Sequence, residues 1–254
     1  MHNISNFHSI ENEKTIPEIR SSYNLEKDAN NRRCAMNRFT NGRSYESMPE
    51  EDLNILSQIK WLTQEKANNI LLPYLDQKYK NTHEEIDEAV NEMKTILDKQ
   101  KNLIFESMER LTKYPILHQK FHLYYTTCAR WPYNRRTWEI WMMSPLQKER
   151  RERLRTQAFA HELIHMQTHK YYESEYPMNQ LDQQQFNMLK ESLTFLLNIE
   201  FPWVNMAKDK WYPNHQEFRK VLEEYRLSCW DKKDFNDLIH FWCQYLLKDN
   251  LKNP

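Results

Sequence analysis

The stretch HEEIDEAVNEMKTILDKQKNLIFESMERL, residues 83–111, decides the fold, because it carries the most regular pattern in the chain. Its apolar side chains recur every three or four residues, the spacing that places them on one face of an α-helix. Thr82 precedes the stretch and Glu85 follows three residues later, a capping-box pattern for a helix start. We therefore expect a long core helix with one continuous apolar stripe. Its members are Ile86, Ala89, Val90, Met93, Ile96, Leu97, Leu103, Ile104, Met108 and Leu111.

Two shorter segments follow, residues 121–127 and 137–143, and both are rich in aromatic and β-branched side chains. They predict two strands joined by a loop that contains Pro132 and Asn134. The expected fold class is mainly α (α+β), with a small antiparallel sheet before the helix at 147–170. Helical spacing and boundary signals predict the other helices at about 49–62, 65–72 (ended or kinked by Pro73), 147–170, 181–199, 214–227 and 234–247.

The composition excludes several classes of function. The chain has 254 residues, of which 1 is glycine (Gly42), and 36 Lys and Arg balance 36 Asp and Glu. One glycine cannot build the loops that cradle phosphates or dinucleotides, because these need several at short spacing. Turns with positive φ are then expected at Asn, Asp or His. The formal net charge of +0 gives no electrostatic reason to expect nucleic acid or an anionic membrane as a partner.

Residues 1–48 are polar and show no apolar period. We expect them to form a flexible or loosely docked segment, whether tail, inhibitory arm or docking element, before a domain at 49–254. The first residues lack the apolar stretch of a signal peptide, and no segment approaches the ~20 apolar residues of a membrane span. The four cysteines are widely spaced and form no CxxC pair. A cytoplasmic protein is the expectation.

Residues 161–165, within the helix expected at 147–170, read His-Glu-Leu-Ile-His, an HExxH motif. Residues four apart lie one turn apart on the same helix face, so His161 and His165 can both reach one Zn²⁺ at about 2.0–2.1 Å. Zinc lowers the pKa of a bound water toward ~7, and Glu162 beside it can act as the general base. Apolar neighbours predict that one face of this helix is buried while the other opens on a cleft: Phe159, Ala160, Leu163, Ile164 and Met166.

A catalytic zinc site needs a third protein ligand. Glu191 is the best candidate. It lies opposite the leucines of the helix expected at 181–199 and is flanked by Met188 and Phe195, which indicates apolar surroundings. A buried carboxylate is costly unless it is paired or binds a metal. An ion pair with an Arg or Lys on a neighbouring helix is the alternative for this residue. His169 continues the histidine stripe but lies about 12 Å along the axis from His161. Cys128 ends a predicted strand and is a further candidate.

With His161, Glu162, His165 and Glu191 so placed, the sequence resembles the zincin metallopeptidases, specifically their gluzincin branch. The resemblance implies Zn²⁺ held by His161, His165 and Glu191, and hydrolysis of peptide bonds in a peptide or protein substrate. It also implies that the strand at 137–143 is the sheet edge on which an extended peptide docks. The metzincin branch instead turns the chain at a Gly two residues after the second His, and residues 166–170 contain no Gly.

The resemblance further implies a donor beyond the third ligand that stabilises the oxyanion of the tetrahedral intermediate. Tyr212 and His215 are the candidates, with packing or helix capping as their alternative role. The Asp that often supports a zinc histidine in this family does not follow Glu191, which leaves Glu173, Glu175 and Asp182 as possible supports.

Two rival functions remain open from the sequence. One is a zinc hydrolase that acts on a non-peptide amide or as an exopeptidase. The other is a non-enzymatic helical interaction protein with a vestigial HExxH motif. In that second case Glu191 would point away from His161 and His165 and would pair with a base.

Overall fold

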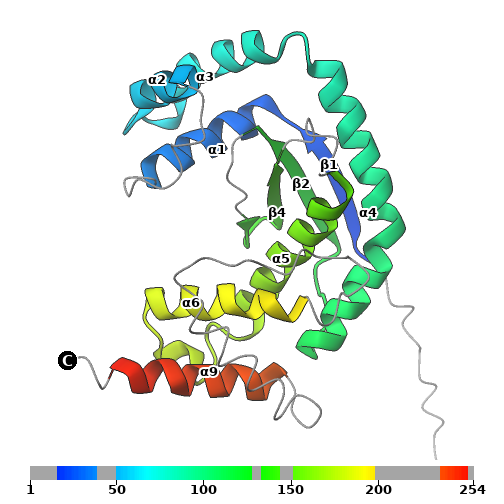
Figure 1. Cartoon of the computed structure of the whole chain (residues 1–254), viewed down its shortest axis with the longest axis vertical. Helices are drawn as coiled ribbons and strands as arrows, with labels where there is room; N and C mark the ends of the chain where they lie inside the picture. The colour runs from blue at the N-terminus through cyan, green and yellow to red at the C-terminus, as the bar shows by residue number, and fades with distance from the viewer. Residues whose placement is uncertain (1–15, 39–49, 128–132, 144–150, 198–234, 251–254) are drawn as a thin grey trace, which may run out of the picture.

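The long helix predicted from residues 83–111 is present as α4 (His83–Thr112), which runs along one side of the molecule (Figure 1). The computed structural model describes residues 16–38, 50–127, 133–143, 151–197 and 235–250. Most of the predicted stripe is buried, but Leu103 is 42% exposed, whereas Phe105, which the stripe omitted, is 4% exposed. Thr82 makes no side-chain cap hydrogen bond, so the expected capping box is wrong.

A mixed four-stranded sheet has the order β1-β2-β4-β3, and its edge strand β1 packs on α4. The strands are β1 (Glu18–Tyr23), β2 (Lys120–Thr126), β3 (Tyr133–Asn134) and β4 (Glu139–Met143). β2 pairs with both β1 and β4 in parallel, whereas β3 and β4 are antiparallel. The fold class of mainly α (α+β) is confirmed, but the expectation of an antiparallel sheet is wrong. The short strand β3 lies in the connection between β2 and β4 and lets β4 run in the direction of β2.

The polar N-terminal segment contributes β1 and α1 (Leu25–Arg38) to this structure. β1 pairs with β2 along its whole length, and α1 packs on α3 (Gln64–Tyr79). Asp28 of α1 is 0% exposed and accepts hydrogen bonds from Thr126 Oγ1 (2.5 Å) and Thr127 N (3.0 Å). The expectation of a flexible or loosely docked segment is therefore wrong for residues 18–38. Polar composition is misleading there, because three polar side chains, Asp28, Asn31 and Arg32, are buried and hydrogen-bonded to residues of distant elements.

Helices α2 (Glu50–Ile59) and α3 lie at one end of the molecule (Figure 1). The expectation that Pro73 ends the second helix is wrong, since α3 continues through it to Tyr79. Proline removes the hydrogen bond to the carbonyl four residues earlier, here that of Asn69. Both Pro73 and Asn69 are exposed, so water can replace the missing donor. The opposite face stays buried through Ala67, Leu71 and Leu75.

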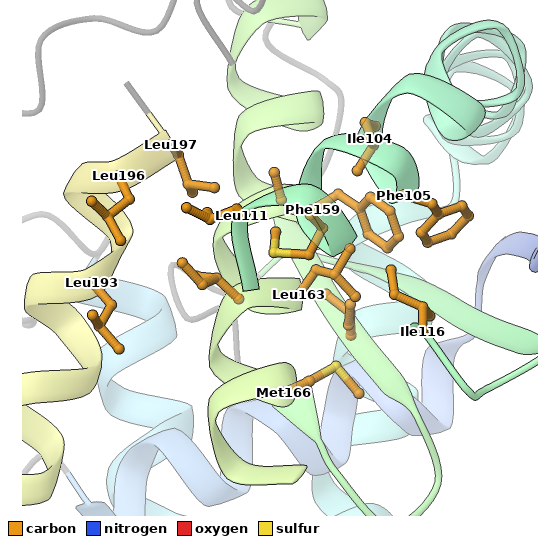
Figure 2. Close-up of a cluster of buried hydrophobic side chains, with 14 of the residues drawn as sticks. Ile104, Phe105, Leu111, Ile116, Phe159, Leu163, Met166, Leu193, Leu196 and Leu197 are labelled. Carbon is orange, nitrogen blue, oxygen red and sulfur yellow. The ribbon is translucent and has the colours of Figure 1, made fainter. Parts of the chain in front are cut away.

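Helix α5 (Arg151–Tyr171) lies at the centre of the fold and positions the HExxH motif. It packs on α4 and β4, and also on α6 (Gln183–Leu193) and the 3₁₀ turn η3 (Thr194–Leu196). The contacts of α5 form the main hydrophobic core. Figure 2 shows Phe159, Leu163 and Met166 of α5 within this core, and most of the other labelled residues come from α4 and the α6–η3 segment.

The C-terminal helix α9 (Phe235–Asn250) runs beside α6 at the end of the molecule opposite α2 and α3 (Figure 1). Its Trp242 is 0% exposed, in agreement with the apolar face predicted for residues 234–247. A short 3₁₀ turn, η2 (Met178–Gln180), lies between α5 and α6 and contacts α9. The helix expected at 214–227 lies outside the described residues. Among the helices that are described, no stretch combines the length and hydropathy needed to cross a bilayer.

Among the residues that the structure describes, three that are not glycine have a positive φ: Trp61 (66°), Lys113 (61°) and Trp138 (54°). The expectation that Asn, Asp or His would take such positions is wrong for these turns. The left-handed conformation costs roughly 1–2 kcal/mol at each residue, and local contacts offset it. Lys113 ends α4 and donates its N–H to Glu109 O at 2.8 Å. Trp138 stacks on His118 with the ring centroids 4.5 Å apart.

Candidate metal centre

The structure brings the three predicted metal ligands together from two helices. His161 and His165 lie one turn apart on α5, and their Nε2 atoms are 3.0 Å apart. Glu191 on α6 places its Oε2 atom 3.7 Å from Nε2 of His161 and 3.5 Å from Nε2 of His165. α6 can present Glu191 here because its other face, with Phe186, Leu189 and Leu193, is buried in the core.

The spacing of these three atoms fits a zinc ion. Ligand atoms at about 2.0–2.1 Å from a tetrahedral zinc are about 3.3 Å from one another. The observed separations of 3.0, 3.5 and 3.7 Å bracket that value. Within the described part of the chain, this is the group of His, Cys, Asp or Glu side chains whose ligand atoms converge in this way. His161, His165 and Glu191 could therefore hold a metal with small adjustments of their side chains.

The protonation states of His165 and Glu191 also suit metal binding, which needs neutral imidazoles and an ionised carboxylate. Burial, together with the charge of His161, lowers the pKa of His165 to about 3, so this imidazole is neutral at pH 7. Burial acts to raise the pKa of Glu191, but the two imidazoles beside its Oε2 atom and the charge of Lys190 outweigh it and lower the pKa. The side chain of His165 is 2% exposed, against 23% for His161 and 25% for Glu191.

Glu162 lies next to this cluster but is not one of its ligands. It is 7% exposed, and burial raises its pKa to about 7, with the negative charge of Glu191 acting in the same direction. A carboxyl group with a pKa near neutrality can both take up and release a proton at physiological pH. The burial is more extensive than the sequence predicted, because α5 is packed on both faces rather than open to solvent along one.

Two residues that the sequence did not single out complete the site, Lys190 and Tyr133. Lys190 Nζ lies 3.3 Å from Glu191 Oε1, the oxygen opposite the one that faces the histidines. Glu191 therefore has an ion pair, but with a lysine of its own helix rather than one on a neighbouring helix. The ring of Tyr133 on β3 lies 5.8 Å from the ring of His165. Burial raises the pKa of Tyr133, and the negative charges of Glu162 and Glu191 add to this shift. The position of Lys190 next to Glu191 in the sequence could have indicated this ion pair. Tyr133 could not be recognised, because it falls in a segment predicted to be a loop.

His169 lies outside the ligand cluster, as the geometry of a straight helix predicts. Its Nε2 atom is 2.6 Å from the hydroxyl oxygen of Tyr133, and its Nδ1 atom is 3.0 Å from Nη1 of Arg135. Burial and the charges of Lys190 and Arg135 lower its pKa to about 4, which leaves the ring neutral at pH 7. This histidine therefore connects the site to β3 and to the turn that follows it.

Each of the three carboxylates proposed from the sequence as supports for a metal-binding histidine has a different partner in the structure. Asp182 caps α6, accepting from Gln185 N at 2.8 Å, and Glu173 pairs with Arg135 and His169. Glu175 is exposed and contacts Ser174. The buried Nδ1 atom of His165 has no hydrogen-bond partner among the described residues. Cys128, Tyr212 and His215, the other candidates from the sequence, lie outside the described residues.

The strand expected to be the sheet edge for peptide docking is β4, and β3 covers part of it. Tyr133 pairs with Ile140 and Asn134 with Glu139, so β4 is not an edge at these two positions. From Trp141 to Met143, β2 is the pairing partner within the described residues. The expectation of an open edge along the whole strand is therefore wrong at its start.

No family model matches this chain, and no curated protein or solved structure matches it at a significant level. The function is therefore inferred from the residues of the site themselves.

Proposed function

We propose that the protein is a zinc-dependent metallopeptidase whose metal is held by His161, His165 and Glu191. The observation that carries the proposal is the convergence of three ligand atoms, separated by 3.0–3.7 Å, beside the buried carboxyl group of Glu162. The preference for a peptide substrate comes from the resemblance of the HExxH motif and the downstream Glu191 to gluzincins.

The residues of the site have distinct roles in this proposal. When bound, zinc supplies a Lewis acid that polarises a carbonyl group and makes water more acidic. Glu162 acts as the general base and later returns the proton to the leaving amine. Its pKa falls when a cation binds nearby, because positive charge favours the carboxylate. Lys190 neutralises the oxygen of Glu191 that does not face the histidines.

The rival role as a non-enzymatic interaction protein is less well supported. It requires Glu191 to turn away from the histidines toward a base. Glu191 does pair with Lys190, but through Oε1, while Oε2 stays within 3.5 Å of His165 and 3.7 Å of His161. Both contacts exist together, so the pair with Lys190 orients the carboxylate rather than removing it from the site.

The test compares the wild type with Glu162→Gln and the control Glu106→Gln, which alters an exposed carboxylate on α4. Fluorescein-labelled casein measures endopeptidase activity, and end-blocked and free peptides separate it from exopeptidase activity. We expect all three proteins to keep one zinc, while Glu162→Gln loses hydrolysis by a factor of about 10²–10⁴. A wild type that binds zinc but cleaves neither casein nor any peptide would overturn the peptidase assignment.

A further inference from the structure

The hydroxyl oxygen of Tyr133 lies within hydrogen-bond distance of two side chains beside the candidate metal centre. His169 Nε2 lies 2.6 Å from its hydroxyl oxygen, and Lys190 Nζ lies 3.3 Å from the same atom. The Lys190 ammonium also lies 5.3 Å from the centre of the Tyr133 ring. The hydroxyl is thereby fixed between α5 and α6, although Tyr133 itself belongs to β3.

The direction of each hydrogen bond follows from which groups can donate. Arg135 has only donors, and its Nη1 atom lies 3.0 Å from Nδ1 of His169, a contact that favours Nδ1 as the acceptor. The Glu173 carboxylate, 3.2 Å from the same Nδ1 atom, can only accept and favours the opposite tautomer. We take the tautomer that the shorter contact, with Arg135, favours. A neutral imidazole that accepts at Nδ1 carries its proton at Nε2. His169 is therefore the donor, and the oxygen of Tyr133 is the acceptor.

Lys190 is also only a donor, so its contact with Tyr133 uses the second lone pair of the same oxygen. The phenol thus accepts twice, and its own O–H proton has no acceptor among the described residues. A hydroxyl whose oxygen accepts two hydrogen bonds, one of them from a charged group, becomes a stronger donor, because hydrogen bonds in a chain polarise one another. The ring of Tyr133 lies 5.8 Å from the ring of His165, measured between centroids. The charges of Glu162 and Glu191 also act on the Tyr133 hydroxyl.

We propose that Tyr133 donates its free O–H to the carbonyl oxygen of the substrate as negative charge develops there, and that His169 and Lys190 are the positioning residues that aim it. This inference rests on the proposed function. It places the oxyanion donor on the strand before the HExxH helix, instead of at Tyr212 or His215 beyond the third ligand. It also explains why a third histidine follows the motif at a distance where it cannot bind the metal.

The first test concerns the hydrogen bonds alone and needs neither metal nor substrate. In metal-free protein at pH 8, long-range ¹H–¹⁵N correlation spectra report which ring nitrogen of His169 carries the proton. We expect the proton at Nε2 in the wild type. A proton at Nδ1 would overturn the inference, because Tyr133 would then have to donate to His169 and would have no proton left for a substrate.

The second test replaces Tyr133 by Phe and uses Tyr176→Phe, which alters an exposed tyrosine, as the matched control. With labelled casein we expect kcat of Tyr133→Phe to fall by roughly 10²–10³ with a smaller change in KM, as for loss of one oxyanion donor. Bound zinc should remain at one equivalent in both variants. An unchanged kcat in Tyr133→Phe would overturn the inference while leaving the zinc peptidase assignment intact.

A third test separates positioning from packing and does not depend on turnover. Acetohydroxamate is the probe, and its affinity for the zinc-loaded protein is measured by calorimetry. We expect it to bind at least 10-fold more weakly to Tyr133→Phe, and more weakly to His169→Leu than to His169→Gln, whose amide can still donate to the phenol oxygen. Equal affinity in all variants would contradict the inference even if the wild type hydrolysed no peptide.

Discussion

Replacing Glu162 by Gln should stabilise the metal-free protein at pH 8, although the same change removes the proposed general base. Glu162 is 7% exposed, and its pKa is raised from 4.5 to about 7, chiefly by burial. At 1.36 kcal/mol per pKa unit, that difference corresponds to about 3 kcal/mol. The folded protein binds this proton more tightly than the unfolded chain does. The cost is therefore absent below pH 4.5, grows between pH 4.5 and 7, and is fully present above pH 7.

The assay is urea denaturation in the presence of EDTA, at pH 8 and at pH 5, for the wild type, Glu162→Gln and the exposed control Glu106→Gln. We expect Glu162→Gln to raise the free energy of unfolding by about 3 kcal/mol at pH 8 and by less than about 1 kcal/mol at pH 5. The control should change neither value. A stability gain that is equal at both pH values, or absent at pH 8, would refute the claim that the ionised carboxylate is held at a cost in the folded site.

Three further changes test the surrounding structure by denaturation. Arg32 is 2% exposed and lies 3.8 Å from Asp28 and 3.6 Å from Asp52. Arg32→Met should therefore lower the free energy of unfolding by about 3–5 kcal/mol, because it leaves buried carboxylates without their cation. An unchanged urea midpoint would contradict this. Leu163→Ala, at a residue 0% exposed in the central cluster, should cost about 2–5 kcal/mol in the same assay. Zinc should raise the melting temperature of the wild type but not of Glu191→Ala, and an equal rise in both would exclude Glu191 as a ligand.

Patterns that depend on one helix were predicted well from the sequence. The period of residues 83–111 gives α4, and the four-residue spacing of His161 and His165 gives their shared face. Glu191 was found because a carboxylate flanked by apolar residues on its helix needs a partner, and its Oε2 atom does lie 3.5 Å from His165. Each of these inferences uses only local geometry and the cost of burying charge.

Features that depend on pairing between distant segments were missed. The sequence of β1, EIRSSY, contains no run of apolar residues, and Ile19 is its one buried residue. Its place in the sheet comes from pairing with β2, which the sequence of the strand does not indicate. Asp28 and Arg32 were assigned to a loose segment because their burial depends on Thr126, Thr127 and α3, far away in the sequence. Tyr133 was missed for the same reason, because its partners lie on α5 and α6.

Zinc binding to the purified, metal-stripped protein tests the central claim most directly. Calorimetric titration with Zn²⁺ should give one equivalent for the wild type and for the control His83→Ala, which changes a partly exposed histidine at the start of α4. His165→Ala and Glu191→Ala should each lose that binding by at least 10-fold in affinity. A wild type that binds no zinc, or a His165→Ala variant that binds it as tightly as the wild type, would contradict the assignment of His161, His165 and Glu191 as a metal centre.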